Sequence, residues 1–225
     1  MIAFISDLYR CSMDATDGEI GKVKDLYIDD VNWAIRYALV DTWKTLPGRR
    51  VLLSPSSFSD LNLIKEQLMV NLDKETIRKS PKISERSSLT FETEEKLADY
   101  YGWLKYWNIN LVEDTVSDAY VKNAFRNNYN LRSEADIRDC RVHAANGRMG
   151  KIVDGVFNTK TWTVQSFVLQ LKYQPENGLL LVTPEEFISS EWSEGDLYLN
   201  GSREAFMKRP IYKSMKELHQ YSPNL

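Results

Sequence analysis

The stretch Asp17–Thr42, DGEIGKVKDLYIDDVNWAIRYALVDT, returns later in the chain as Asn146–Leu171, NGRMGKIVDGVFNTKTWTVQSFVLQL. The two stretches are 129 residues apart and align without insertion or deletion. Identical residues also align on both sides of them: Asp7 with Asp136, Cys11 with Cys140, Pro55 with Pro184, Phe58 with Phe187 and Pro81 with Pro210. A period this long indicates tandem domains, since solenoid repeats span roughly 20–50 residues. We therefore interpret the chain as two copies of one domain, over about residues 7–83 and 136–212.

The residue pattern of one copy is typical of short strands joined by turns. Asp17-Gly18 is a turn signal, because glycine accepts a positive φ. Gly21 then begins an alternating strand, the polar run 29–32 predicts a turn, and a second period-two strand follows Trp33. Further strands are expected at 51–53 and 68–72, and Asp73 can cap a short helix through Lys79. Four or five short strands in so few residues predict a small antiparallel barrel.

Several blocks of the first copy resemble a known family. GEIGKVKDLYIDD, W-AIRY-LVDT, LPGRRVLLSP and ETIRKSP occur in that order and are similar to the PRC-barrel family. This family is named for the cytoplasmic barrel of the photosynthetic reaction-centre H subunit, and it includes the C-terminal domain of the bacterial ribosome maturation factor. The second copy departs from the pattern, with Asn158-Thr159 in place of Asp29-Asp30. The resemblance implies a fold more than an activity, since folds host unrelated functions.

The expected fold is mainly β with short helices: two small antiparallel PRC-type β-barrels joined by a helical connector. The predicted boundaries are residues 1–83 for the first barrel, 84–131 for the connector, and 132–225 for the second barrel with its C-terminal tail. Within the connector, helices are expected over about 92–101, capped by Thr90 or Thr93, and over 116–126. Ser133 is expected to cap a short helix that begins the second copy.

Composition narrows the classes of function. The formal net charge is −3, so the chain lacks the basic bias typical of a nucleic-acid footprint. No stretch approaches the ~18 consecutive apolar residues that a membrane span needs, and the first residues lack the basic region of a signal peptide. Cys11 and Cys140 occupy equivalent positions, which favours buried structural thiols. We expect a cytoplasmic protein without a membrane span.

An aromatic group in the connector is the most unusual local feature of the sequence. It consists of Tyr100, Tyr101, Trp103, Tyr106 and Trp107. Tyrosine and tryptophan dominate interface hot spots, so this group could form an interface or a ligand platform, including a symmetric dimer contact. Alternatively, the connector folds back and these rings pack against a barrel or between the barrels. The pattern favours packing.

Two further sets have a functional and a structural interpretation. Arg36, Lys44, Arg49 and Arg50 form the local basic set of the first copy, which could contact phosphate or an acidic partner, although a solvated face is the favoured interpretation. Trp33 and Trp162 begin matching strands and are expected to anchor the core of each copy. A stacking platform for RNA bases is the alternative for these two tryptophans.

Candidate catalytic and metal-binding residues do not assemble. Asp25, Asp29, Asp30 and Asp41 suggest a cation site, but no Asp-x-Asp-x-Asp-Gly loop is present and a solvated turn is favoured. Asp25 recurs as Asp154, which indicates a structural hydrogen bond to the turn. His143 and His219 stand in unrelated contexts, and no nucleophile elbow, Walker loop or dinucleotide fingerprint is found. We predict no cofactor and no metal.

These observations favour a non-enzymatic binding or adaptor module that holds a macromolecular partner. The partner is expected to be a protein, and a second copy of the same chain is one candidate. An RNA- or ribosome-associated role, as the resemblance to the ribosome maturation factor implies, is the alternative. A third class is an enzyme with a small site between the barrels.

Overall fold

The computed structural model describes residues 1–42, 49–83, 89–108, 130–172 and 178–221. They form two compact units, each described by itself. Unit 1 contains Met1–Arg10, Asp25–Arg36 and Arg132–Leu225, and unit 2 contains Cys11–Lys24 and Tyr37–Leu131. Unit 1 therefore combines the second copy with two segments of the first copy. The predicted boundaries at 83/84 and 131/132 follow the two sequence copies and do not coincide with the two units. As boundaries of separate domains they stay a prediction.

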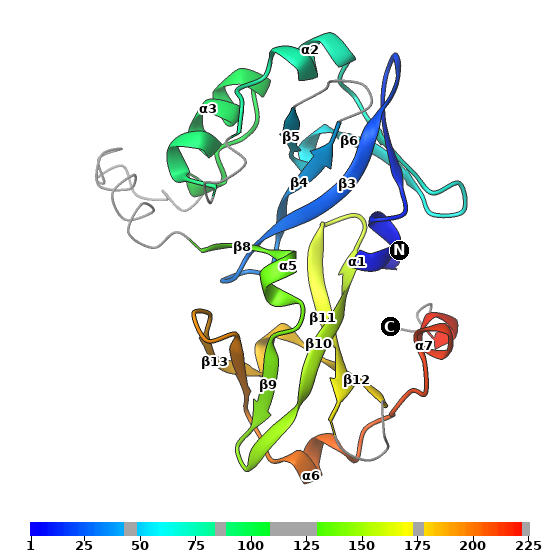
Figure 1. Cartoon of the computed structure of the whole chain (residues 1–225), viewed down its shortest axis with the longest axis vertical. Helices are drawn as coiled ribbons and strands as arrows, with labels where there is room; N and C mark the ends of the chain where they lie inside the picture. Colours follow the sequence, from blue (N-terminus) through cyan, green and yellow to red (C-terminus); the bar gives the residue numbers. More distant parts are fainter. Residues whose placement is uncertain (43–48, 84–88, 109–129, 173–177, 222–225) are drawn as a thin grey trace. The chain divides into compact units, whose positions relative to one another are not determined.

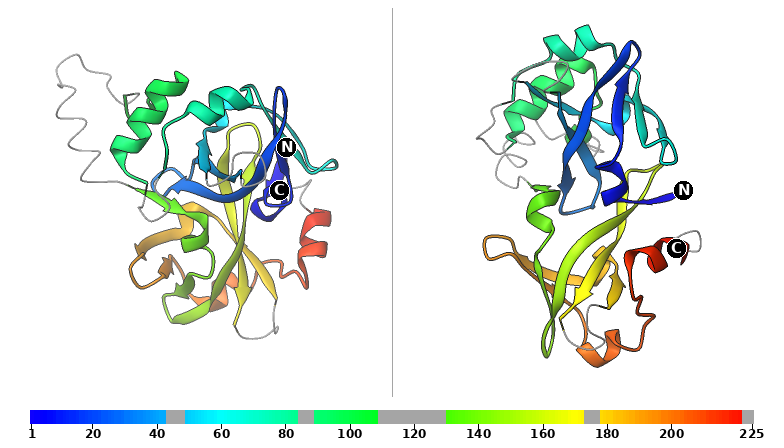
Figure 2. Two further views of the ribbon diagram at one scale, coloured as in Figure 1. Left: turned by 45° about the horizontal axis from the view of Figure 1, so that its top comes forward. Right: turned by 45° about the vertical axis from the view of Figure 1, so that its right-hand side comes forward.

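Unit 1 is built on a seven-stranded sheet with the order β12-β11-β10-β9-β14-β13, and β1 pairs with β10 beside this path (Figure 1). The strands are β1 (Ile2–Phe4), β9 (Arg141–Ala144), β10 (Gly147–Asn158), β11 (Thr163–Leu171), β12 (Leu179–Val182), β13 (Phe187–Glu191) and β14 (Asp196–Leu199). Strands β10 and β11 form a long twisted hairpin, seen from two sides in Figure 2. The turn of this hairpin is closed by Asn158, whose side-chain oxygen accepts a hydrogen bond from the backbone N–H of Lys160 at 2.8 Å.

Unit 2 carries most of the other seven-stranded sheet, whose order is β5-β4-β3-β2-β7-β6 with β8 paired to β3. The strands are β2 (Ser12–Ala15), β3 (Gly18–Asp29), β4 (Ile35–Asp41), β5 (Arg50–Leu53), β6 (Phe58–Asn62), β7 (Gln67–Val70) and β8 (Leu131–Ser133). The end of β3 and the start of β4 belong to unit 1. The two sheets repeat one strand order, as the 129-residue offset predicts.

One feature of the predicted fold class is wrong in part. Each sheet contains a parallel pair, β2 with β7 and β9 with β14, so neither sheet is purely antiparallel. The chain reaches β7 and β14 only after intervening strands, and this longer connection allows the parallel direction. Over the described residues each sheet order runs as an open path, from β12 to β13 and from β5 to β6. The fold is mainly β, and closure into barrels stays a prediction.

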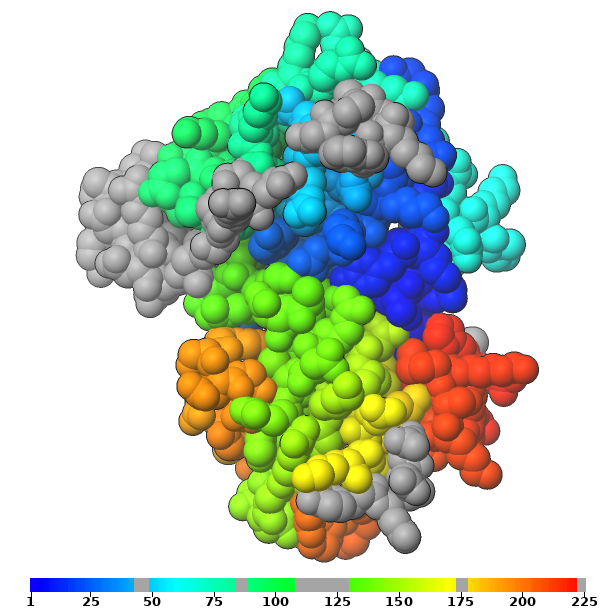
Figure 3. All heavy atoms as spheres, in the orientation of Figure 1, coloured from blue at the N-terminus to red at the C-terminus, as the bar shows by residue number. Residues whose placement is uncertain are grey.

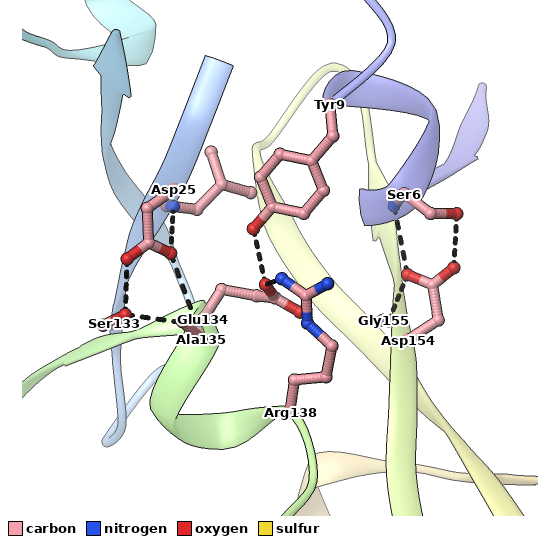
Figure 4. A network of polar contacts seen from close by, with 10 residues as sticks. Ser6, Tyr9, Asp25, Ser133, Glu134, Ala135, Arg138, Asp154 and Gly155 are labelled. Atoms are coloured by element: carbon pink, nitrogen blue, oxygen red, sulfur yellow. Dashed lines mark hydrogen bonds and ion pairs between the residues drawn. The ribbon is translucent and has the colours of Figure 1, made fainter. Parts of the chain in front are cut away.

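The two copies exchange their first strands. β1 pairs with β10 of the second copy, and the equivalent strand β8 pairs with β3 of the first copy. Asp25 and Asp154, which occupy equivalent positions in the two copies, also contact the opposite copy within unit 1 (Figure 4). Asp154 accepts a hydrogen bond from the backbone N–H of Ser6 at 3.1 Å, and Asp25 accepts one from the backbone N–H of Ala135 at 3.3 Å. The predicted structural role of these aspartates therefore includes capping the first helix of the other copy.

The hairpin turns of the two copies also pair reciprocally inside unit 1. Trp33 and Trp162 both adopt a positive φ, 58° and 53°, which is uncommon for a bulky side chain. The backbone N–H of Ile35 donates to the carbonyl of Trp162 at 2.7 Å, and the backbone N–H of Val164 donates to the carbonyl of Trp33 at 2.9 Å. Each tryptophan backbone thus binds the strand that follows the other tryptophan.

Short helices close the ends of the sheets. They are α1 (Ile5–Leu8), α2 (Lys74–Lys79), α3 (Phe91–Tyr101), α5 (Glu134–Ile137), α6 (Arg203–Phe206) and α7 (Met215–Tyr221), with 3-10 turns at Pro55–Ser57, Tyr106–Asn108 and Pro184–Glu186. Asp73, Thr90 and Ser133 cap α2, α3 and α5 as predicted. The helix predicted over 116–126 lies outside the described residues. No helix of the described part is long and apolar enough to cross a membrane.

The C-terminal helix α7 packs on the sheet of unit 1. Leu218 is buried in a cluster with Phe4, Val156 and Val168. The His219 ring stacks on Phe4 with ring centres 4.0 Å apart. The first strand and the last helix of the chain therefore share one apolar cluster, and the C-terminal segment docks rather than extending freely.

Candidate binding site

The aromatic group of the connector packs inside unit 2. Trp107 is 1% exposed, and its ring meets Phe91 edge-on with ring centres 5.0 Å apart. Trp103 stacks on Tyr101 at 4.4 Å, and its indole N–H donates to Ser57 Oγ at 2.8 Å. These contacts attach α3 and the following turn to the sheet, in agreement with the packing interpretation.

The two remaining rings of this group are tied down by hydrogen bonds. The Tyr106 hydroxyl donates to the Glu94 carboxylate at 3.1 Å, and the Tyr100 hydroxyl donates to the Thr76 carbonyl at 2.7 Å. Tyr100 keeps part of its ring exposed. An interface built on this group stays a prediction.

The predicted basic set is spread over different surroundings. Arg36 lies in unit 1 and donates to the Asp29 carboxylate at 2.8 Å. Arg49 lies in unit 2 and donates to the backbone carbonyl of Ser80. Arg50 begins β5, and Lys44 lies outside the described residues. Two of the four predicted positions thus have internal acceptors.

The predicted acidic set serves hydrogen bonding within the fold. Asp29 Oδ1 accepts from the backbone N–H of Val31 at 3.0 Å, closing the hairpin turn. Asp25 accepts the Ser133 hydroxyl at 2.5 Å. Among the described residues, no three His, Cys, Asp or Glu side chains are grouped so that they could hold a metal ion.

A pocket of about 400 Å³ in unit 1 is the candidate site. We call it the tryptophan pocket. The hairpin turn of the first copy forms one wall, and the 3-10 turn and β13 of the second copy form the other. Its lining comprises Asp30, Val31, Asn32, Trp33, Pro184, Glu185, Phe187, Ile188, Ser189, Ser190, Trp192 and Leu197. Because the pocket is formed by segments of both copies, neither copy contains it alone.

Three aromatic rings shape the tryptophan pocket. The ring centre of Trp33 lies 6.3 Å from that of Phe187 and 6.4 Å from that of Trp192. Trp33 also meets Phe167 of the core edge-on at 5.0 Å. The sequence predicts that Trp33 anchors the core of its own copy, but its ring packs on Phe167 and Phe187 of the second copy and also lines the pocket. An apolar or cationic group of a ligand would bind favourably against these aromatic rings.

Asp30 organises one side of this pocket. Its carboxylate accepts a hydrogen bond from Arg132 Nε at 2.7 Å. The Arg132 guanidinium lies 5.1 Å from the centre of the Trp192 ring, within cation–π range. Burial raises the pKa of Asp30 above its ordinary value, and the bond from Arg132 opposes that effect. Asp30 therefore holds the Arg132 guanidinium beside the Trp192 ring.

The rim of the pocket is apolar and acidic. Val31 is 69% exposed and Ile188 is 64% exposed, although both are large aliphatic residues. The segment 183–202, which includes β13 and β14, contains five acidic residues and no lysine or arginine: Glu185, Glu186, Glu191, Glu194 and Asp196. Figure 3 shows the outer surface of this segment in orange. Glu186 and Asp196 pair with Arg209 and Arg141, so the negative charge near the apolar rim comes from Glu185, Glu191 and Glu194.

Comparison of equivalent positions in the two copies shows which pocket residues recur and which occur in this pocket alone. Trp33 and Phe187 have the equivalents Trp162 and Phe58, so these aromatic positions recur in both copies. Asp30, Arg132 and Trp192 have the equivalents Thr159, Ala3 and Leu63. The triad of Asp30, Arg132 and Trp192 is therefore not required by the repeated fold, which points to a role of its own.

Sequence reasoning did not identify this site. It interpreted Asp30 as part of a solvated turn and gave no role to Arg132 or Trp192. The signal lay in the repeat itself, because Trp192 replaces a leucine at the offset of 129 residues. The pairing of Asp30 with Arg132, 102 positions apart, has no such signal.

No protein-family model matches this chain, and no curated protein matches it in sequence.

Proposed function

We propose that the chain is a non-enzymatic, cytoplasmic binding module that holds a protein partner through the tryptophan pocket. The observation that carries the proposal is the Asp30–Arg132–Trp192 triad beside exposed Val31 and Ile188. Interface hot spots are rich in tryptophan and arginine and centre on preformed pockets. Here the pocket is held in shape before any partner arrives, which lowers the entropic cost of binding.

The same reasoning favours protein over RNA. Phosphate groups are attracted by lysine and arginine, whereas Asp30, Glu185, Glu191 and Glu194 surround or border this pocket. Arg132, whose guanidinium lies beside the Trp192 ring, is paired with Asp30. The RNA-associated alternative therefore stays a prediction without support from this site.

We further propose that the chain is a tandem member of the PRC-barrel family. Support comes from the sequence blocks of the first copy and from the strand order that the two sheets share. The family supplies no activity by itself, so the proposed binding role depends on the pocket.

A site-specific photo-crosslinker tests the binding role. Placed at Ile188 on the pocket rim, it is expected to capture one defined protein from native cell extract. The matched control places it at Ile64, an isoleucine that is 97% exposed in the corresponding hairpin of the first copy. Equal capture at both positions, or none at Ile188, contradicts the proposal.

A second test replaces a pocket residue by the residue at the equivalent position of the other copy. Trp192→Leu and Asp30→Thr each introduce the residue found at the equivalent position, so the fold is expected to accept them. Each is expected to reduce capture at Ile188 by about tenfold, the effect of losing about 1.4 kcal/mol of binding energy. Leu63→Ala, in the other hairpin, is expected to leave capture unchanged. Undiminished capture by both pocket variants would show that the pocket is not the contact.

A further inference from the structure

The strand that borders the tryptophan pocket has a free edge. β13 is the last strand of its sheet, paired with β14 on one side. Within the described residues, no strand or loop is hydrogen-bonded to its other side. Four of its five residues are exposed. An unpaired edge of this kind presents backbone N–H and C=O groups that another strand can bind.

The opposite end of the same sheet is treated differently. At β12, Leu179 exchanges two backbone hydrogen bonds with Tyr212, at 2.7 and 2.9 Å. The chain thus covers the edge of β12 with its own backbone, whereas none of the residues that the structure describes covers the edge of β13. The fold can therefore cover an edge strand of this sheet, as it does at β12.

The charge around β13 argues against a second copy of the chain as the occupant. Two β13 strands side by side would bring Glu185, Glu191 and Glu194 of each copy together, whereas Glu186 and Asp196 are already paired with Arg209 and Arg141. An extended segment with lysine or arginine would instead complement the exposed Glu185 and Glu194. Ser189 and Ser190 are short and leave the backbone accessible to such a strand.

We propose that the partner binds by strand addition: an extended, basic segment of another protein pairs with the free edge of β13. An apolar side chain of that segment enters the tryptophan pocket, whose lining includes Phe187 to Ser190 of the same strand. Backbone bonds give affinity in this mode and the side-chain pocket gives specificity. This inference rests on the proposed binding role and adds the partner's conformation and charge.

The probe is a phage-displayed library of random twelve-residue peptides, selected on the full chain and counter-selected on Trp192→Leu. We expect the enriched peptides to carry more lysine and arginine than aspartate and glutamate. We expect their affinity to fall as sodium chloride is raised, since rim charges are screened by salt. Failure to enrich any peptide on the wild-type chain over the variant overturns both the proposed function and this inference.

Backbone methylation separates the two proposals. A selected peptide is synthesised with one N-methyl group at a time, which removes one N–H donor without changing the side chains. Strand addition predicts an alternating pattern, with about tenfold weaker binding at every second position and little effect between. Binding that depends on Trp192 but tolerates methylation everywhere would overturn strand addition while leaving the binding role intact. An enriched set dominated by acidic peptides would overturn the charge argument in the same way.

Discussion

Tyr9 and Arg138 occupy equivalent positions in the two copies, 129 residues apart, and they contact each other: the guanidinium of Arg138 lies 5.2 Å from the centre of the Tyr9 ring. Figure 4 shows that both side chains converge on Glu134. The Tyr9 hydroxyl donates to Glu134 Oε2 at 2.5 Å, and Arg138 Nη2 donates to the same oxygen at 2.6 Å. Equivalent residues meet each other where a two-fold relation brings like surfaces together, as in an isologous dimer.

The reciprocal contacts make unit 1 resemble a dimer interface within one chain. Asp25 and Asp154 each cap a helix of the other copy, and the turns of Trp33 and Trp162 bind each other's following strand. Unit 1 consequently needs segments that precede residue 37. The copies are repeated in sequence but depend on each other in structure.

The first prediction concerns the halves of the chain. Residues 130–225 expressed alone lack β1 and the hairpin turn 25–36, so β10 loses a partner strand and the cluster around Leu218 loses Phe4. Removing a buried phenylalanine alone costs about 3–5 kcal/mol. We expect this half to show weak amide protection by hydrogen exchange, and we expect mixing with residues 1–129 to restore protection in a one-to-one complex. Full protection in the isolated half would show that the copies fold independently.

The second prediction concerns the Asp154 cap. Its carboxylate is buried and accepts three hydrogen bonds, from the backbone N–H and hydroxyl of Ser6 and the backbone N–H of Gly155. Asp154→Ala leaves these donors without their acceptor, and we expect it to lower the free energy of unfolding by about 2–3 kcal/mol in urea titrations. The control Glu75→Ala breaks an exposed ion pair with Lys79 and is expected to cost less than about 0.5 kcal/mol. If the two substitutions lower the free energy of unfolding by similar amounts, the Asp154 cap does not stabilise the chain more than an exposed ion pair does.

Much of the fold could be predicted because its signals are local or repeated. Alternation of apolar residues located β3, β4, β5 and β7 but did not predict β6. Asp73, Thr90 and Ser133 marked the helix starts. The parallel pairs could not be predicted in this way, because strand direction within a sheet depends on contacts between distant segments. The exchange of β1 and β8 between the copies has the same origin.

The candidate site was harder to predict than the fold. The position of Trp33 at the start of a strand predicts an anchor for the core of its own copy, but its ring packs on Phe167 of the second copy. Its second role depends on Trp192, which reaches it only through the folding of the β13–β14 hairpin. Pairwise comparison of the copies could have marked Trp192, but not its partners Asp30 and Arg132.

The third prediction concerns the close approach at Gly150. A Cβ at this position would lie 1.9 Å from the backbone oxygen of Gln170, across the β10–β11 hairpin. Backbone cannot move aside as easily as a side chain, so we expect Gly150→Ala to destabilise the chain by about 3 kcal/mol or more. Gly155→Ala is the matched comparison, since its Cβ would meet the flexible end of the Ile5 side chain. We expect a smaller cost there, measured by thermal unfolding, and the reverse order would argue against the tight hairpin.

The fourth prediction concerns the pH dependence that Glu134 confers. Burial raises the pKa of its carboxyl above the ordinary value. The folded chain then binds more protons than the unfolded chain between the two pKa values, so the free energy of unfolding falls as pH rises through that window. In the variant Glu134→Gln the side chain at this position has no titratable carboxyl. We therefore expect the stability advantage of the wild type over this variant to shrink in urea titrations as pH rises above the ordinary carboxyl pKa.

Tyr9→Phe provides the second arm of this experiment. The Tyr9 hydroxyl donates to Glu134 and lowers the pKa of that carboxyl, in opposition to burial. Removing the hydroxyl is expected to raise the pKa further and widen the pH window in which stability falls. A wild-type advantage over Glu134→Gln that instead grows with pH would mean that the ion pair with Arg138 outweighs burial. In that case the contact between Tyr9, Glu134 and Arg138 would stabilise the exchanged segments through charge. Tyr9→Phe would then reduce the growth of that advantage with pH, because the lost hydrogen bond also favours the ionised carboxylate.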